Sequence, residues 1–126
     1  MTECGCNGDS EKMILIYACS GAANVAEIAD RAARKIAGGG CATMFCLAGL
    51  GAGIPGMIQT ARDADMNVLI DGCDLDCAKR IFERAGVSHY RQIKVTDYGI
   101  AKGGEPVTDE QVQVIVDKAE EALAAK

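Results

Sequence analysis

Two cysteines lie four positions apart in the stretch DGCDLDC, residues 71–77, which follows a short apolar run. Cysteine thiolates bind zinc and other soft metal ions, and a pair of thiols can also cycle through a disulfide. The chain has seven cysteines among its 126 residues. Its polar start, MTECGCNGDSEK, lacks the features of a signal peptide. We therefore expect a cytoplasmic protein whose cysteines are thiols, metal ligands or redox groups rather than a disulfide framework.

The sequence around these cysteines predicts strands that alternate with helices. Short apolar runs predict four strands, over residues 13–18, 42–45, 67–70 and 90–95. Apolar residues at helical spacing predict four helices, over residues 24–37, from Pro55 to Ala61, over 75–85 and over 109–123. Asn24 with Glu27, and Thr108 with Gln111, have the spacing of capping boxes, and Asp74 is a candidate N-cap. The glycine-rich stretch LAGLGAGIPG is expected to be a loop.

This alternation predicts an α/β fold, a three-layer αβα sandwich around a mainly parallel four-stranded sheet, flavodoxin-like or Rossmann-like. The fourth predicted strand alternates polar and apolar residues, which suits an edge position and a strand order of 2-1-3-4. A chain of this length has one core. We expect a mobile, cysteine-containing tail over residues 1–12 and a single domain with a cysteine metal site over residues 13–126.

Four cysteines follow predicted strands and are therefore expected on one rim of the sheet. Cys19, Cys46 and Cys73 come after the first, second and third strands, and Cys77 falls in the first turn of the next helix. The carboxyl ends of parallel strands share a rim, where open α/β folds bind ligands. Neighbouring strands are about 4.8 Å apart and zinc–sulfur bonds are about 2.3 Å long, so the four thiolates can converge on one tetrahedral zinc. The sequence therefore predicts a zinc site made of Cys19, Cys46, Cys73 and Cys77.

The remaining candidate residues surround this predicted site. Asp71 and Ser20 are candidates for hydrogen bonds that orient the metal ligands, although for Asp71 we favour a carboxylate that accepts loop amides over a general base. Close backbone contact with a bound metal or small anion is possible at three glycines, Gly49, Gly51 and Gly53. The tail carries a C-x-C pair of possible auxiliary thiols, Cys4 and Cys6, whereas Cys41 precedes a strand and belongs to the opposite rim.

The motifs CSGAAN, FCLAGLGAG and IDGC followed by DC and AK together resemble the DGC-domain family, which is named for the triplet that is here Asp71, Gly72 and Cys73. The resemblance covers residues 13–103. Zinc binding has been proposed for that family through four chelating cysteines, and the positions that match them are Cys19, Cys46, Cys73 and Cys77. The resemblance thus implies the same ligand set as the strand positions.

Two other functions remain open at this stage. The same cysteines could serve a thiol redox protein or a sulfur carrier. The stretch GAGIPG, residues 51–56, also fits the G-x-G-x-x-G pattern of nucleotide-binding modules, with Asp71 about 20 residues further on. Four thiolates would leave a bound zinc no open position for water, so we lean away from an enzyme and towards a binding, sensing or trafficking role.

Composition limits the partners that we expect. Thirteen basic and eighteen acidic residues give a net charge of −5, and no basic stripe is present to neutralise phosphates. No apolar stretch approaches the roughly 18 residues of a membrane span. We therefore expect a metal ion as the partner, with no nucleic acid and no membrane. Zinc is the expected metal, and an iron–sulfur cluster is a second possibility because thiolates bind both.

Overall fold

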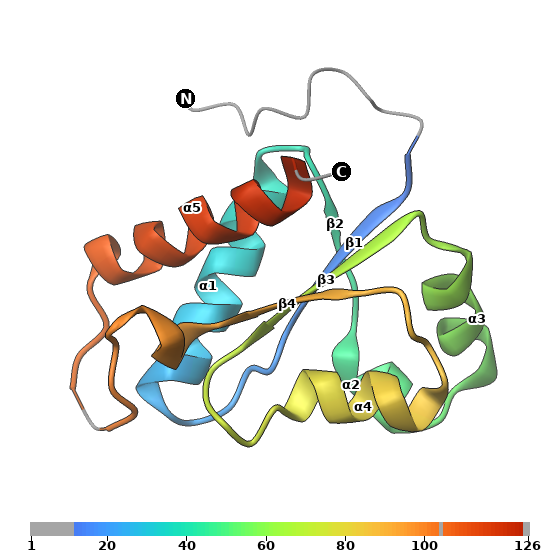
Figure 1. The fold of residues 1–126 in the computed structure, drawn as a ribbon, viewed down its shortest axis with the longest axis horizontal. Helices are drawn as coiled ribbons and strands as arrows, with labels where there is room; N and C mark the ends of the chain where they lie inside the picture. Colours follow the sequence, from blue (N-terminus) through green and yellow to red (C-terminus); the bar gives the residue numbers. More distant parts are fainter. Residues whose placement is uncertain (1–11, 104, 125–126) are drawn as a thin grey trace.

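The computed structural model describes residues 12–103 and 105–124, and four parallel strands form the centre of this part of the chain (Figure 1). The strands are β1 (Ile14–Ala18), β2 (Thr43–Met44), β3 (Met66–Asp71) and β4 (Arg91–Lys94). They pair in the order β2-β1-β3-β4, so the predicted order is confirmed and β4 lies at an edge. The central pair, β1 with β3, has five residues in register, from Ile14 opposite Met66 to Ala18 opposite Ile70.

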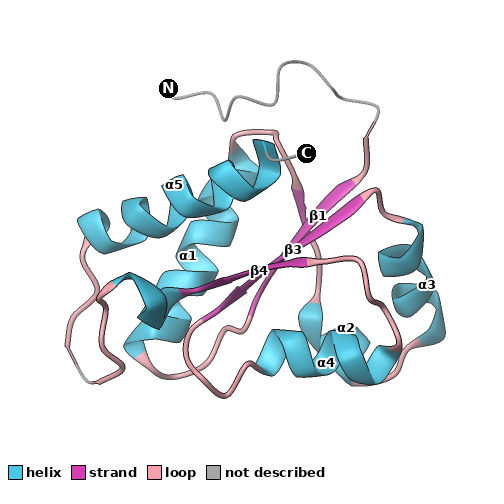
Figure 2. Ribbon diagram, viewed as in Figure 1, coloured by secondary structure: helices cyan, strands magenta, loops and turns pink. Residues whose placement is uncertain are grey.

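Helices cover both faces of the sheet, as the predicted three-layer α/β sandwich requires (Figure 2). One face is covered by α1 (Asn24–Gly38) and α5 (Asp109–Ala124), and the other by α2 (Leu47–Gly51), α3 (Pro55–Asp63) and α4 (Cys77–Ala85). A 3-10 turn, η1 (Val95–Tyr98), follows β4. Alternate residues of a strand point to opposite faces. Accordingly, Ile16 and Val68 pack against α1 and α5, whereas Leu15 and Leu69 pack on the other side.

A buried polar contact links the two central strands. The hydroxyl of Tyr17 donates a hydrogen bond to Asn67 Oδ1 at 2.9 Å, and both side chains are fully buried. Asn67 Nδ2 in turn donates to the backbone oxygens of Ala61 and His89. Burial raises the pKa of the Tyr17 hydroxyl well above its usual value because the charged form would be desolvated. Tyr17 is therefore a neutral hydrogen-bond donor in the core.

The structure confirms some predicted helix ends and corrects others. Thr108 and Gln111 form the predicted capping box, since each side chain bonds the other's backbone amide. The predicted capping box at Asn24 is wrong. Helix α1 has Ala23 as its N-cap, and the Asn24 side chain instead bonds Ala101 and Gly103 in a distant loop.

The prediction of a loop over the whole of LAGLGAGIPG is also wrong. Residues 47–51 form α2, because Leu47 and Leu50, three positions apart, are both buried in the core beneath α4. The predicted tail lies outside the described residues except for Lys12, and so do Cys4 and Cys6. In the part of the chain that the structure describes, no helix is long and apolar enough to cross a membrane.

Candidate cysteine site at the carboxyl rim

The structure describes four free thiols, and all four follow strands on the carboxyl rim of the sheet. Cys19 directly follows β1, Cys46 follows β2 by two residues, Cys73 follows β3 by two residues, and Cys77 is the first residue of α4. Cys46 and Cys77 are exposed, whereas Cys19 and Cys73 are half-buried. Three distant stretches of sequence therefore bring four thiols to one side of the sheet.

Three of these thiols line one surface pocket of about 590 Å³. Cys19, Cys46 and Cys77 lie in its wall, together with Asp30 and Arg34 of α1. Arg34 Nε is 2.7 Å from Asp30 Oδ2, so the two charges in the wall are paired with each other. The rest of the lining is largely apolar and includes Phe45, Leu47 and Ile81. The pocket thus has cysteine sulfur atoms in a largely apolar wall, together with one ion pair whose two charges neutralise each other.

Cys73 faces a different neighbour. It packs beside the core that α1 and α5 share with the sheet, and Lys102 Nζ lies 3.7 Å from its sulfur. The loop that carries Lys102 is held by Asn24, whose amide contacts residues on both sides of the lysine. Asn24 therefore places a cation beside one of the four thiols.

The thiol of Cys19 is held by the backbone of the DGC triplet. The amide of Gly72 donates a hydrogen bond to Cys19 Sγ at 3.3 Å. Burial raises the pKa of Cys19, and the Gly72 amide opposes this by stabilising the thiolate. Negative charge at Asp71, Cys77 and Cys73 raises the pKa of Cys19 further. Cys19 is thus tied to the segment that carries Cys73 and Cys77, although Cys73 does not line the pocket.

In this conformation the thiols do not form a finished coordination sphere. Among residues 12–103 and 105–124, no three His, Cys, Asp or Glu side chains lie close enough together to hold a metal ion. Tetrahedral zinc needs sulfur atoms about 2.3 Å from the metal. The residue types therefore fit a soft metal, and their exposure leaves Cys46 and Cys77 room to turn, but coordination requires a rearrangement of side chains.

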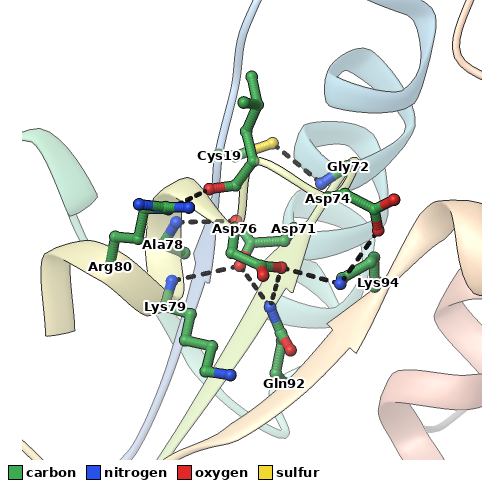
Figure 3. Close-up of polar contacts among 11 residues, drawn as sticks. Cys19, Asp71, Gly72, Asp74, Asp76, Ala78, Lys79, Arg80, Gln92 and Lys94 are labelled. Carbon is green, nitrogen blue, oxygen red and sulfur yellow. Dashed lines mark hydrogen bonds and ion pairs between the residues drawn. The ribbon is translucent and has the colours of Figure 1, made fainter. Parts of the chain in front are cut away.

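Asp71 is the buried anchor of the segment that carries Cys73 and Cys77 (Figure 3). Its carboxylate accepts hydrogen bonds from the amides of Ala78 at 2.8 Å and Lys79 at 3.2 Å. It therefore caps α4 from the end of the preceding strand. Asp71 accepts backbone amides as predicted, but they belong to the first turn of α4 and not to a loop. Asp74 is not the N-cap because α4 begins only at Cys77.

Gly72 fits where a side chain would not. A Cβ built at this position would lie 3.0 Å from Val25 Cγ2 and 3.1 Å from the backbone nitrogen of Ala26. The chain therefore passes against the first turn of α1, and its oxygen also accepts the amide of Thr96 at 3.2 Å. This close approach explains the glycine of the DGC triplet without any bound ligand.

Sequence reasoning missed Gln92 and Lys94, which read as solvent-facing residues of an edge strand. Gln92 Nε2 donates to Asp71 Oδ2 at 2.8 Å and to Asp76 Oδ1 at 2.9 Å. Lys94 Nζ lies 3.0 Å from Asp76 Oδ1 and 3.3 Å from Asp74 Oδ1. The sequence contained a signal for these contacts. Two hydrogen-bond donors lie at positions i and i+2 of the predicted edge strand, and the stretch DGCDLD has three carboxylates that can accept from them.

Ser20 and the glycines occupy positions that differ from their expected ones. Ser20 has a left-handed backbone and its hydroxyl donates to Asp30 at 2.9 Å, so its described partner in the pocket is a carboxylate and not a thiol. Gly49 is buried inside α2 against Met57. Gly51 and Gly53 line a separate pocket that contains Arg80 and Arg84.

The G-x-G-x-x-G stretch does not directly follow a strand, as a dinucleotide fingerprint would. It begins at the last residue of α2 and runs into α3. Nucleotide binding therefore stays a prediction that the fold does not strengthen.

Comparison with known proteins agrees with the motifs at this rim. The family model described as the DGC domain matches residues 15–119. A curated protein of Pseudomonas aeruginosa, "Anaerobic and virulence modulator AnvM", is 34% identical over 88 residues, which are 70% of this chain and 67% of that protein. No solved structure matches the chain.

Proposed function

This chain belongs to the DGC-domain family, and we propose that it binds a metal ion, zinc in the first place, through Cys19, Cys46, Cys73 and Cys77. The observation that carries the proposal is the pocket at the carboxyl rim, which three free thiols line. Cys73 supplies the fourth thiol from the adjacent segment, whose Gly72 amide donates a hydrogen bond to Cys19 Sγ.

The chemistry of the donors supports binding rather than catalysis. Four thiolates would close a tetrahedral zinc site and leave no position for an activated water. Cys46 and Cys77 are exposed, so their sulfur atoms can turn towards Cys19 and Cys73. A binding, sensing or trafficking role in the cytoplasm, where thiols stay reduced, follows from this proposal. Such a role is in keeping with the name of the related AnvM, a modulator.

The first experiment is a measurement of zinc, iron and labile sulfide on protein purified without oxygen and without a metal-binding tag. The proposal expects about one zinc per chain, with loss of most of it in Cys46→Ser and in Cys77→Ser. Asp30→Asn is the matched control, because Asp30 lines the same pocket without supplying a thiol. Equal zinc loss in the control would contradict the assignment of the ligands, and iron with sulfide would replace zinc by a cluster.

A second candidate is thiol chemistry without metal, in a redox protein or a sulfur carrier. Two observations favour it: the described side chains form no ready metal cluster, and Cys73 has a lysine beside its sulfur. This candidate expects a metal-free protein in which Cys73 or Cys77 reacts unusually fast with iodoacetamide near neutral pH. Slow alkylation of both thiols in metal-free protein would exclude it.

A further inference from the structure

We propose that Gln92 and Lys94 of β4 are positioning residues for Cys73 and Cys77. They act by fixing Asp71, Asp74 and Asp76 of residues 71–77, the stretch that also carries both cysteines and is called here the DGC segment (Figure 3). The inference rests on the proposed cysteine site, because it states how two of its thiols are held. It does not depend on which metal binds.

The side-chain amide of Gln92 bridges two carboxylates that would otherwise repel each other. Its nitrogen lies within 2.9 Å of oxygens on both Asp71 and Asp76. Asp71 has no exposed surface, so its charge depends on protein donors. Asp71 precedes Cys73 by two residues and Asp76 precedes Cys77 by one, so this bridge joins the start of the DGC segment to its end.

Lys94 adds a second tie on the same face of β4. Its ammonium group contacts Asp76 and Asp74, and its own side chain is only 17% exposed. Ion pairs that water can still reach add little to net stability, so we assign this contact to geometry rather than to the folding energy. Two residues of one strand thus hold three carboxylates of the DGC segment.

The backbone of the DGC segment is fixed in an unusual conformation by these ties. Asp76 has a left-handed backbone with φ of +53°, which side chains other than Asn and Asp adopt at a cost. Its amide donates to the oxygen of Cys73 at 3.1 Å, and its oxygen accepts the amide of Arg80 at 2.8 Å. Backbone hydrogen bonds therefore hold the turn between the two cysteines both before and after Asp76. The conformation of this turn sets the directions in which the side chains of Cys73 and Cys77 point.

Cobalt(II) titration of the full chain tests this role, because the absorption of cobalt in thiolate sites reports its coordination geometry as well as its affinity. We expect Gln92→Leu to weaken cobalt and zinc binding by roughly tenfold or more and to change the cobalt spectrum, as losses of supporting hydrogen bonds do at metal sites. Gln92→Lys, which keeps a donor, should recover binding. Gln113→Leu is the matched control, since Gln113 bonds Asp117 on the surface of α5.

Asp76→Gly separates positioning from a failure to fold. Glycine adopts a left-handed backbone without strain, so this variant removes the carboxylate and keeps the turn. It should fold as the wild type does and lose affinity as Gln92→Leu does. Binding and cobalt spectra that match the wild type in both Gln92→Leu and Asp76→Gly would overturn the proposal.

A readout without metal distinguishes failure of the proposed function from failure of this inference. In the metal-free protein, Gln92→Leu and Asp76→Gly should change the iodoacetamide rates of Cys73 and Cys77 relative to Cys46, which lies on the same rim but in another segment. Faster hydrogen exchange should be confined to residues 73–79. If the wild type binds no metal but these changes occur, the positioning role stands and the metal function fails. Unchanged ratios and unchanged exchange would overturn the positioning role.

Discussion

The carboxylate of Asp71 accepts a hydrogen bond from the amide of Ala78, seven residues later, at 2.8 Å. The last residue of β3 therefore caps the helix that follows it, without help from the residues in between. Because the carboxylate is fully buried, it satisfies helix amides that water does not reach and places negative charge at the positive end of α4. The position of α4, and with it Cys77, is tied to the centre of the sheet.

Replacement of Asp71 by alanine should destabilise the fold by about 2–3 kcal/mol. The variant leaves the backbone amides of Ala78 and Lys79 without their charged acceptor, which is among the costlier losses of hydrogen bonding. Urea unfolding followed by circular dichroism measures this loss. Asp117→Ala on the surface of α5 should change the unfolding free energy by no more than about 0.5 kcal/mol. A similarly small effect for Asp71→Ala would refute the capping role.

Gly72→Ala should cost about 1–3 kcal/mol, because the added methyl group meets Val25 and the backbone of α1. The same change at Gly56, in the first turn of α3, meets nothing within 4 Å and should be neutral or slightly stabilising. Thermal unfolding of the two variants side by side provides the comparison. Equal melting temperatures would show that the close approach at Gly72 is not a constraint.

Tyr17 should make the fold sensitive to alkali. Its folded pKa is raised above the unfolded value of 10.0, so the folded protein keeps a proton that the unfolded chain releases. The stability from this group is complete below pH 10 and declines as the pH rises above 10. Tyr17→Phe should lose about 1–3 kcal/mol at pH 7, because Asn67 Oδ1 loses its donor.

The same variant should then lose less stability than the wild type between pH 9 and pH 11. Urea unfolding at several pH values in this range tests the expectation. Parallel declines in the two proteins would assign the alkaline loss to other groups.

Asn24→Ala should loosen the loop that carries Lys102. Asn24 accepts the amide of Gly103 at 2.8 Å and donates to the oxygen of Ala101 at 3.0 Å, so the loop loses two hydrogen bonds. Each contributes on the order of 1 kcal/mol, so the loss of both predicts a rise of roughly thirtyfold in tryptic cleavage after Lys102. Cleavage after Arg84 in α4 serves as an internal control in the same digest. An equal rise at both sites would indicate global destabilisation instead of a local release.

The order of the strands was predictable because the polarity of each strand matches its place in the sheet. The runs ILIYA and VLI are apolar throughout and lie in β1 and β3, which helices cover on both faces. Polar and apolar residues alternate over Gln92, Ile93 and Lys94, and these residues lie in the edge strand β4. Thr108 and Gln111 bond each other as their spacing predicts, because nothing else in the described chain competes for them.

The wrong helix caps share one physical cause. Asn24 has the side chain of a capping residue, but the loop at 101–103 offers it both a donor and an acceptor. Asp74 lies where an N-cap is expected, yet Asp71 already occupies the helix amides from a buried position. In each case another partner, far along the chain for Asn24 and a few residues earlier for α4, replaced the expected cap, and a single sequence gives no measure of that competition.

The positions of the thiols could be predicted from the order of the strands. The side chains that fix the segment around Cys73 and Cys77 could not. The positions of Cys19, Cys46 and Cys73 follow from the parallel sheet alone, since each comes after a strand. The contacts of Gln92 and Lys94 depend on the path of the turn at Asp76, which has a left-handed backbone. Aspartate tolerates this conformation, but the sequence does not show which of the three aspartates adopts it. The zinc itself stays a prediction.

The two edge strands of the sheet have few backbone groups with which a strand of a second molecule could pair. At one border β2 pairs with β1 through only two residues, so within the described chain it presents a very short row of backbone groups. At the other, β4 is four residues long and carries Arg91 and Lys94. Short strands and cationic side chains both oppose the addition of a foreign strand. The protein should therefore resist aggregation by intermolecular strand pairing, even though its central strands are rich in isoleucine, leucine and valine.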